Sequence, residues 1–427
     1  MFHIKGSITT ATFNRIAASL LPAVSRTSSF LARRSAHGRP AGRHNFASVA
    51  SVTSEISYSF IDNRLQFFKA CDQLKKSSTL AFDIECEFNR NHYGTHLCLV
   101  QVSDGDDIFI LDPTTVGNLD PLWEILASEN EVIVHSPGSD ITLLDKLYNR
   151  RPSNLFCTEL AARLLGCETP SLSYLLGKYF GAQKDGTLTT SDWLQRPLPK
   201  EMLKYAALDV AFLHELKGVL VSELKEKGRL QWHKEECLEM EKIRYRETIN
   251  PHLQIQGSKN LSKEEAHVLK HLFQVRDALA KDINKPAFHI MPNKVLIRLA
   301  RNPPLLLRQW KNMRALGVSR RVQKQDDLVR FHRAVMTAKA STPEPLETPP
   351  TKNWFFLDQN KAKAKILEQI RTRILAEYPD VGSIVLSKRV SKSLAAGNIT
   401  LLDLRDWQRA IVLRIGKELD LAMSKLY

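Results

Sequence analysis

The sequence lacks any long hydrophobic run, and it also lacks paired cysteines. No stretch approaches the roughly 18 consecutive apolar residues that cross a bilayer, so no membrane span and no membrane partner are predicted. The six cysteines are scattered and none forms a CxxC pair, which favours reduced thiols over a disulfide framework or a zinc site. A chain of 427 residues with ordinary apolar and charged fractions is long enough for roughly two to four domains.

The first 54 residues lack acidic side chains altogether, since the first acid is Glu55. This segment is rich in Ser, Thr and Ala, contains seven basic residues, and is typical of an organelle transit peptide. We expect it to direct the protein to mitochondria; a disordered basic tail has the same composition and would leave the protein cytoplasmic. The whole chain has a formal net charge of +15, and the part after residue 54 is also basic, which fits a polyanionic partner.

Residues 79–85 (TLAFDIE) alternate between apolar and polar side chains, which predicts a β-strand. A strand sends alternate side chains to opposite faces, so Asp83 and Glu85 emerge side by side, opposite an apolar face. Two carboxylates this close repel each other unless a cation or a proton lies between them. A divalent metal ion such as Mg²⁺ or Mn²⁺ would neutralise this repulsion by binding both carboxylates. A half-buried strand with a polar face, without any metal, has the same sequence pattern.

The segments after this strand predict one mixed-sheet α/β domain that ends near residue 225. Residues 96–102 and 107–111 surround an Asp-Gly turn and predict a hairpin. We then expect helices over 121–128, 138–148, 158–165, 171–179 and 199–225, and a strand over 131–135. Further on, 229–246 reads as a charged helical connector. Ser262 and Glu265 form a capping box that opens a helical module. Asn293 is placed to cap a helix over 294–301. After a proline-rich linker, helices over 361–376 and 402–423 indicate a second module.

Three downstream side chains lie where they can complete an acidic site. Asp140 follows the predicted strand 131–135 and falls in the first turn of a helix, where an acid is also favoured by the helix dipole alone. Tyr205 and Asp209 are four residues apart in a predicted helix and share one face, as a simple surface Tyr–Asp pair would. Four carboxylates can hold two divalent ions about 4 Å apart for phosphodiester hydrolysis. The Tyr205 hydroxyl can then hold the attacking water.

The order of these motifs resembles that of the DEDD 3′–5′ exonucleases. Phe-Asp-Ile-Glu at 82–85, His-x₄-Asp at 135–140 and Tyr-x₃-Asp at 205–209 resemble the three exonuclease motifs, and the tyrosine matches the DEDDy branch. The segments 161–166, 191–193 (SDW) and 196–198 (RPL) are similar to those of ribonuclease D. Two helical modules resemble HRDC domains, the first through 276–277 and 291–293 and the second through Trp407.

The resemblance implies an α/β ribonuclease H-like exonuclease domain with a mixed sheet flanked by helices, followed by two small all-α HRDC-like domains. The implied divisions are a transit peptide or tail at 1–54, the exonuclease domain at 55–228, a connector at 229–256, HRDC-like domains at 257–340 and 353–427, and a linker at 341–352. It also implies that Asp83, Glu85, Asp140 and Asp209 bind two Mg²⁺ or Mn²⁺ ions, with Tyr205 positioning the water. Two departures, a proline in the second motif and Cys157 where an Asp is common, remove no ligand.

The implied function is 3′–5′ exoribonuclease activity on RNA with a free 3′ end, such as a tRNA precursor, releasing nucleoside 5′-monophosphates. An exosome-associated enzyme is a variant of this reading. A DNA 3′–5′ exonuclease and an inactive nucleic-acid-binding scaffold are the alternatives. As nucleic-acid contacts we name Trp193, Arg196, Arg320 and Arg321. Trp193 either stacks on a terminal base or is a core residue, and basic runs around Arg320 and Arg321 either bind phosphates or are solvated helix faces.

Overall fold

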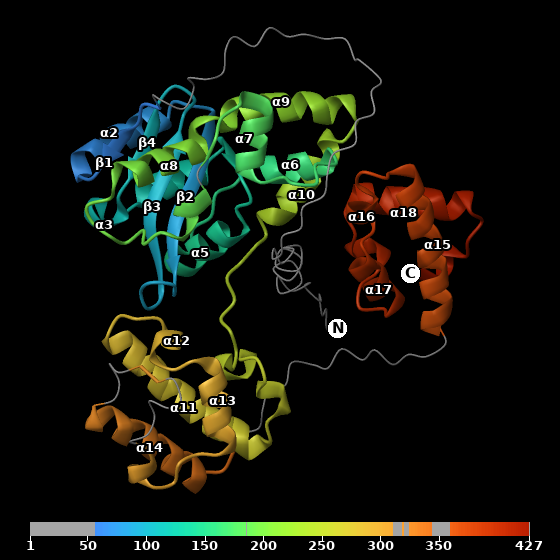
Figure 1. Cartoon of the computed structure of the whole chain (residues 1–427). Helices are drawn as coiled ribbons and strands as arrows, with labels where there is room; N and C mark the ends of the chain where they lie inside the picture. Colours follow the sequence, from blue (N-terminus) through green and yellow to red (C-terminus); the bar gives the residue numbers. More distant parts are fainter. Residues whose placement is uncertain (1–55, 185, 311–317, 320–323, 344–358, 427) are drawn as a thin grey trace, which may run out of the picture.

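The computed structural model describes residues 56–184, 186–310, 318–319, 324–343 and 359–426. Figure 1 shows an α/β body, a helical module built from α11 to α14, and a second helical module built from α15 to α18. The predictions for residues 1–54, for Arg320 and Arg321, and for the linker from residue 344 onward lie outside the described residues. Within the described part of the chain, no helix combines the length and the apolar character needed to cross a membrane.

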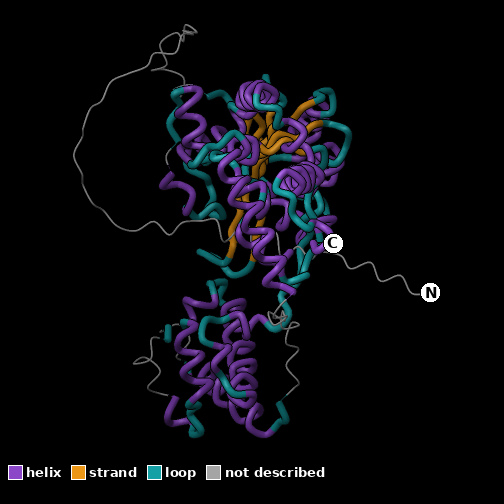
Figure 2. The backbone as a smooth tube through the Cα atoms, turned by 90° about the vertical axis from the view of Figure 1, so that its right-hand side faces the viewer, coloured by secondary structure: helices purple, strands orange, loops and turns teal. Residues whose placement is uncertain are grey.

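A six-stranded mixed sheet of order β1-β4-β3-β2-β5-β6 forms the centre of the α/β body. The strands are β1 (Ser59–Ile61), β2 (Thr79–Phe88), β3 (Thr95–Ser103), β4 (Ile108–Leu111), β5 (Glu131–Val134) and β6 (Leu155–Cys157). The predicted hairpin is present as β3 and β4, and β2 pairs antiparallel with β3 and parallel with β5. The short strand β6 was not predicted, because three apolar residues carry no readable period. Figure 2 shows the strands enclosed by helices.

Most helices of this body follow the prediction, although the short helix at Pro113–Val116 was not predicted and one predicted helix is divided in two. The helices are α2 (Arg64–Leu74), α3 (Pro113–Val116), α4 (Asp120–Leu126), α5 (Gly138–Tyr148), α6 (Thr158–Leu164), α7 (Leu172–Phe180), α8 (Lys200–Ala211), α9 (Leu213–Glu226) and α10 (Leu230–Met240). The single helix predicted over 199–225 is wrong, because the chain leaves helical geometry at Phe212 (φ −116°, ψ 8°). The Phe212 ring there stacks on Phe180 at 5.4 Å. No Gly or Pro marks the break, so tertiary packing sets it.

The two faces of β2 are buried against different elements. Leu80, Phe82 and Ile84 pack with residues of α2, α4 and α5, whereas Ala81 faces a second cluster that includes residues of α6, α7 and α9. Asp83 and Glu85 have the parity of Ala81, so they emerge on the second face, which α8 also covers. The apolar alternation of β2 therefore aims both carboxylates at α8.

The first helical module contains α11 (Lys263–Asp282), α12 (Ala287–Ile290), α13 (Asn293–Arg301) and α14 (Gln325–Ala340). The predicted capping box is confirmed, because Ser262 and Glu265 exchange both of its hydrogen bonds at the start of α11. The predicted Asn293 cap is wrong. Asn293 Oδ1 instead accepts a hydrogen bond from Arg276 Nη1 over 2.7 Å, because the Arg276 side chain is buried and needs acceptors inside the module.

The second helical module contains α15 (Gln359–Glu377), α16 (Gly382–Val385), α17 (Lys388–Ala395) and α18 (Asp406–Glu418). The helix predicted over 402–423 is too long at both ends. A 3₁₀ turn at Leu401–Asp403, capped by Thr400, precedes α18, and Asp420 beyond its end has a φ of 48°. A side chain in the left-handed region ends a helix, because regular α-helix needs negative φ.

Candidate active site

Three of the predicted ligands, from two elements, meet at one point. Asp83 and Glu85 come from β2 and Asp209 from α8, and each offers a carboxylate oxygen within 4.8 Å of the other two. Asp140 lies in the first turn of α5, as predicted. It does not belong to this close group of three, but its charge acts on Asp83 and Glu85. The four acids thus form one electrostatic unit.

Burial and mutual repulsion disfavour the charged forms of these acids. Burial, followed by the nearby Asp209 and Asp140 carboxylates, raises the pKa of Asp83 well above its ordinary value. Burial likewise raises the pKa of Asp140, to about 7. Buried like charges need a cation between them to ionise together. Asp209 Oδ2 has no hydrogen-bond partner within the described structure, as expected for an oxygen kept for a ligand. The donor set, all carboxylate oxygen, fits a hard divalent ion.

A lysine that the sequence reading did not single out lies in this cluster. Lys184 Nζ forms an ion pair with Asp209 Oδ1 and lies 3.8 Å from the centre of the Tyr205 ring. Burial works to lower the pKa of Lys184, but the charge of the Asp209 carboxylate and its hydrogen bond to Lys184 outweigh burial and raise that pKa. The ammonium therefore stays charged and offsets part of the acidic charge. The signal available in the sequence was only a lone lysine seven residues before the SDW segment at 191–193.

Tyr205 lies one helical turn before Asp209 on α8, so both side chains reach the same site. The Tyr205 hydroxyl is hydrogen-bonded to Thr189 Oγ1 at 2.9 Å. Burial raises the pKa of Tyr205, so the phenol is neutral at physiological pH and has a proton to donate. It can hold and orient a water beside the carboxylates.

The proline in the second motif leaves Asp140 in the first turn of α5. Ser136, with φ 56°, turns the chain between β5 and α5, and Pro137 occupies the position before the helix. His135 Nδ1 is 2.9 Å from Thr158 Oγ1, which itself donates to the carbonyl of Val134. The Thr158 oxygen therefore accepts from His135, and the imidazole proton is on Nδ1. The connection between β5 and α5 is thus fixed from the side of α6.

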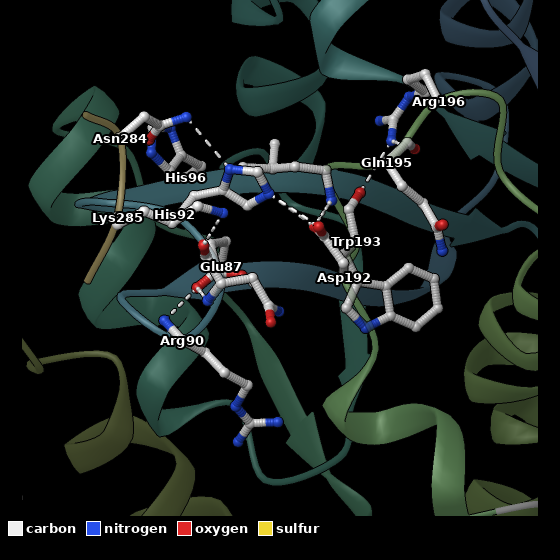
Figure 3. Close-up of polar contacts among 12 residues, drawn as sticks. Glu87, Arg90, His92, His96, Asp192, Trp193, Gln195, Arg196, Asn284 and Lys285 are labelled. Carbon is white, nitrogen blue, oxygen red and sulfur yellow. Dashed lines mark hydrogen bonds and ion pairs between the residues drawn. The ribbon is translucent and has the colours of Figure 1, made fainter. Parts of the chain in front are cut away.

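Two of the predicted nucleic-acid contacts are corrected by the structure. Trp193 is only 2% exposed and packs with Met202 and Tyr205, so it is a core residue and not a platform for a base. The guanidinium of Arg196 donates to both carboxylate oxygens of Asp112, over 2.5 and 2.9 Å, and to backbone carbonyls. Its donors serve the interior of the domain. Figure 3 shows both side chains.

Comparison with known proteins agrees with this architecture. The family model of the 3′-5′ exonuclease domain matches residues 58–225, and that of the HRDC domain matches residues 265–329. Ribonuclease D of Zymomonas mobilis is 27% identical over 353 residues, which cover 77% of this chain and 87% of that protein. The chain thus contains a 3′-5′ exonuclease domain and an HRDC domain, and it is similar in sequence to ribonuclease D. Ribonuclease D of Sphingobium indicum is 30% identical over 58% of this chain and 65% of that protein.

Solved structures show the same fold over most of the chain. A protein from Bifidobacterium adolescentis matches with a TM-score of 0.72 and 23% identity, over 84% of this chain and 96% of that one. Escherichia coli RNase D matches with a TM-score of 0.64 and 21% identity, over 85% of this chain and 98% of that one. The predicted fold class, an exonuclease α/β domain followed by helical domains, is therefore confirmed.

Proposed function

We propose that this protein is a metal-dependent 3′–5′ exoribonuclease that removes nucleotides from a free RNA 3′ end as nucleoside 5′-monophosphates. The observation that carries the proposal is the convergence of Asp83, Glu85 and Asp209 on one point, with Tyr205 a helical turn from Asp209. This arrangement supplies carboxylates for metal binding and a neutral hydroxyl for water positioning in the same place. All four predicted acids are present, which disfavours an inactive scaffold.

Different side chains of the site have different roles in the proposed hydrolysis. Asp83, Glu85, Asp140 and Asp209 would hold two Mg²⁺ or Mn²⁺ ions. When bound, such ions lower the pKa of a coordinated water and stabilise the leaving oxygen of the phosphodiester. Tyr205 orients the water through its hydroxyl. A hydrogen bond of 2.9 Å between Thr189 Oγ1 and the Tyr205 hydroxyl oxygen holds that group in place. Lys184 brings a positive charge that offsets the acids and lies beside both Tyr205 and Asp209.

The substrate class we favour is structured RNA, in particular tRNA precursors with 3′ extensions. The solved relative from E. coli is described as an exoribonuclease involved in structured RNA processing. The net charge of +15 favours a polyanionic substrate of this kind.

We further propose that the acid-free segment 1–54 directs the protein to mitochondria, on the strength of its composition. Loss of mitochondrial fluorescence from a tagged chain lacking residues 1–54 is the expected result; unchanged location would refute it.

The function is tested with purified protein, Mg²⁺ or Mn²⁺, a 3′-extended tRNA and a single-stranded DNA of matched sequence. We expect stepwise shortening of the RNA from its 3′ end, release of nucleoside 5′-monophosphates, and loss of activity with a chelator. An RNA whose 3′ hydroxyl is blocked by a bulky group should remain intact. Preferential hydrolysis of the DNA would make the protein a DNA exonuclease, and absence of hydrolysis with both polymers would contradict the proposal.

A further inference from the structure

The hairpin between β2 and β3 ends in a tightly built loop, residues 89–94, which we call the hairpin tip. The backbone N–H of Asn89 donates to the carbonyl of Gly94 over 2.8 Å, and the N–H of Gly94 donates to Asn89 Oδ1 over 2.7 Å. The buried Glu87 carboxylate accepts hydrogen bonds from backbone N–H groups of the loop, including that of Asn91 at 3.0 Å. The tip is therefore held in one conformation before it meets anything else.

On its outer side the hairpin tip is bonded to the HRDC domain. The Tyr93 hydroxyl donates to Asp277 Oδ2 over 2.7 Å, and the Tyr93 N–H donates to Asn284 Oδ1 over 3.1 Å. Lys285 Nζ donates to the carbonyl of Asn91 over 3.3 Å. Asp277 lies in α11, and the other two follow the end of that helix. The contact is polar, and it is made to a loop at the end of the strand that carries the catalytic carboxylates.

On its inner side the tip reaches the segment beside the active site through His92. The imidazole Nε2 lies 2.9 and 3.0 Å from the two carboxylate oxygens of Asp192, and Nδ1 lies 3.2 Å from Asn284 Nδ2. An amide NH₂ can only donate, so Nδ1 accepts and Nε2 carries the proton that Asp192 accepts. Figure 3 shows His92 between Asn284 of the HRDC domain and Asp192. A side chain of the HRDC domain thus sets the tautomer of His92.

From Asp192 the contacts continue to the predicted water-positioning residue. Trp193, the next residue, is buried with its ring centre 5.9 Å from that of Tyr205. Its backbone carbonyl accepts from Arg196, whose guanidinium is held by Asp112. The segment that backs Tyr205 is therefore anchored at one end by Arg196 and at the other by the bond between Asp192 and His92.

We propose that the hairpin tip couples the HRDC domain to the active site, with His92 and Asp192 as positioning residues that hold Trp193 against Tyr205. Neither residue belongs to the acidic cluster, so they act on catalysis through Tyr205. Misplacement of a catalytic group by about 1 Å can cost about a hundredfold in rate, so a partial loosening should be measurable. The kinetic part of the inference rests on the proposed exonuclease function.

The test uses the full-length chain and a short single-stranded RNA, with kcat and KM measured separately. We expect His92→Phe and Asp192→Ala each to lower kcat about tenfold, an effect set by geometry, with KM unchanged. The double variant should be no slower than the worse single variant, because both remove the same bond. His92→Gln keeps an amide donor for Asp192 and should restore most of the rate. His289→Phe, which replaces an exposed histidine of the HRDC domain, is the matched control.

A second readout does not depend on activity. Backbone hydrogen exchange in residues 188–198 should be faster in His92→Phe, Asp192→Ala and Asn284→Ala than in the wild type, and unchanged in His289→Phe. Faster exchange without any RNA hydrolysis by the wild type would leave the coupling standing and refute the proposed function. Unchanged exchange in all three variants, or rate losses that multiply in the double variant, would overturn the coupling. A rise in KM alone would assign His92 to RNA binding and overturn its positioning role.

Discussion

The two helical modules are joined to the exonuclease domain in opposite ways. The second module, α15 to α18, shares one continuous hydrophobic cluster with α6, α7 and α9, and Trp407 stacks on Trp232 with ring centres 4.5 Å apart. The HRDC domain has its own cluster, to which Tyr93 is the one exonuclease-domain residue that adds apolar contact among the described residues. Hydrogen bonds of the hairpin tip also join the HRDC domain to the exonuclease domain.

This difference indicates different roles for the two modules. Burial of apolar area is the largest favourable term in packing, so the second module should fold and unfold with the exonuclease domain. Hydrogen bonds at a polar contact contribute about 1 kcal/mol each and exchange readily with water. The HRDC domain can therefore change its position at small energetic cost. In the coupling proposed above, the hairpin tip transmits such a change to Tyr205 through His92 and Asp192.

The largest expected effect is on the stacked tryptophans. Trp407→Ala removes a nearly buried ring from the shared cluster and should destabilise the folded protein by about 3–5 kcal/mol. Urea unfolding followed by circular dichroism should show one transition for the exonuclease domain and second module together, moved to lower urea. Trp232→Ala should have the same direction, and the double variant should lose less than the sum. Separate transitions for the two parts in the wild type would show that the second module unfolds independently of the exonuclease domain.

Gly166 should be the next most sensitive position at this interface. A Cβ there would lie 2.7 Å from the Cβ of Asp380, and Gly166 also has a φ of 87°. Gly166→Ala should cost about 1–3 kcal/mol through overpacking, in addition to the strain of positive φ. Gly117→Ala is a matched control, since Gly117 has a φ of 80° and no atom within 4 Å of its would-be Cβ. Equal losses of stability in the two variants would show that the interface tolerates the added methyl group.

A smaller effect is expected from the ion pair of the same interface. Arg229 Nη1 donates to Asp380 Oδ2 over 2.6 Å, and this bond lowers the pKa of the Asp380 carboxyl below its ordinary value. A depressed folded-state pKa stabilises the protein above the unfolded-state pKa, and this stability is lost as the pH falls through the folded-state pKa. Asp380→Asn should cost about 1 kcal/mol or less at pH 7. The difference from wild type in urea midpoint should shrink as the pH falls through the folded-state pKa of Asp380, and a constant difference would contradict the assignment.

The smallest effect on stability belongs to the contact with the HRDC domain. Tyr93→Phe removes only the hydroxyl that donates to Asp277, and should change the free energy of unfolding by about 1 kcal/mol or less. Exchange of the amides at residues 89–94 should nevertheless increase, because the tip loses one anchor. Phe68→Tyr, which adds a hydroxyl at an exposed position of α2, serves as a control of the same size. A loss as large as that of Trp407→Ala would erase the distinction between the two modules.

Local sequence patterns predicted most of the secondary structure, whereas the features that the patterns missed depend on tertiary contacts. The alternation in residues 79–85 predicted β2 and the shared face of Asp83 and Glu85, and the Asp-Gly turn predicted the hairpin of β3 and β4. The helix break at Phe212 and the burial of Trp193 depend on partners distant in sequence, Phe180 and Tyr205, so no local signal revealed them.

The residues of the candidate site also differ in whether the sequence alone could reveal them. Its acids were found because motif order and parity are visible in a sequence. Lys184 was missed because its importance comes from a position 25 residues before Asp209 that only the fold brings next to it. Arg196 was read as a nucleic-acid contact because its partner, Asp112, is 84 residues away.

The assignment of the active site is tested most directly by the activity of Asp83→Asn on a 3′-extended tRNA with Mg²⁺. Asparagine keeps the shape of the side chain and removes the charge that metal binding needs, so we expect kcat to fall at least about a hundredfold. Asp106→Asn, an exposed carboxylate in the turn between β3 and β4, should retain full activity. Equal activity of Asp83→Asn and the wild type would contradict the assignment of the carboxylate cluster as the active site.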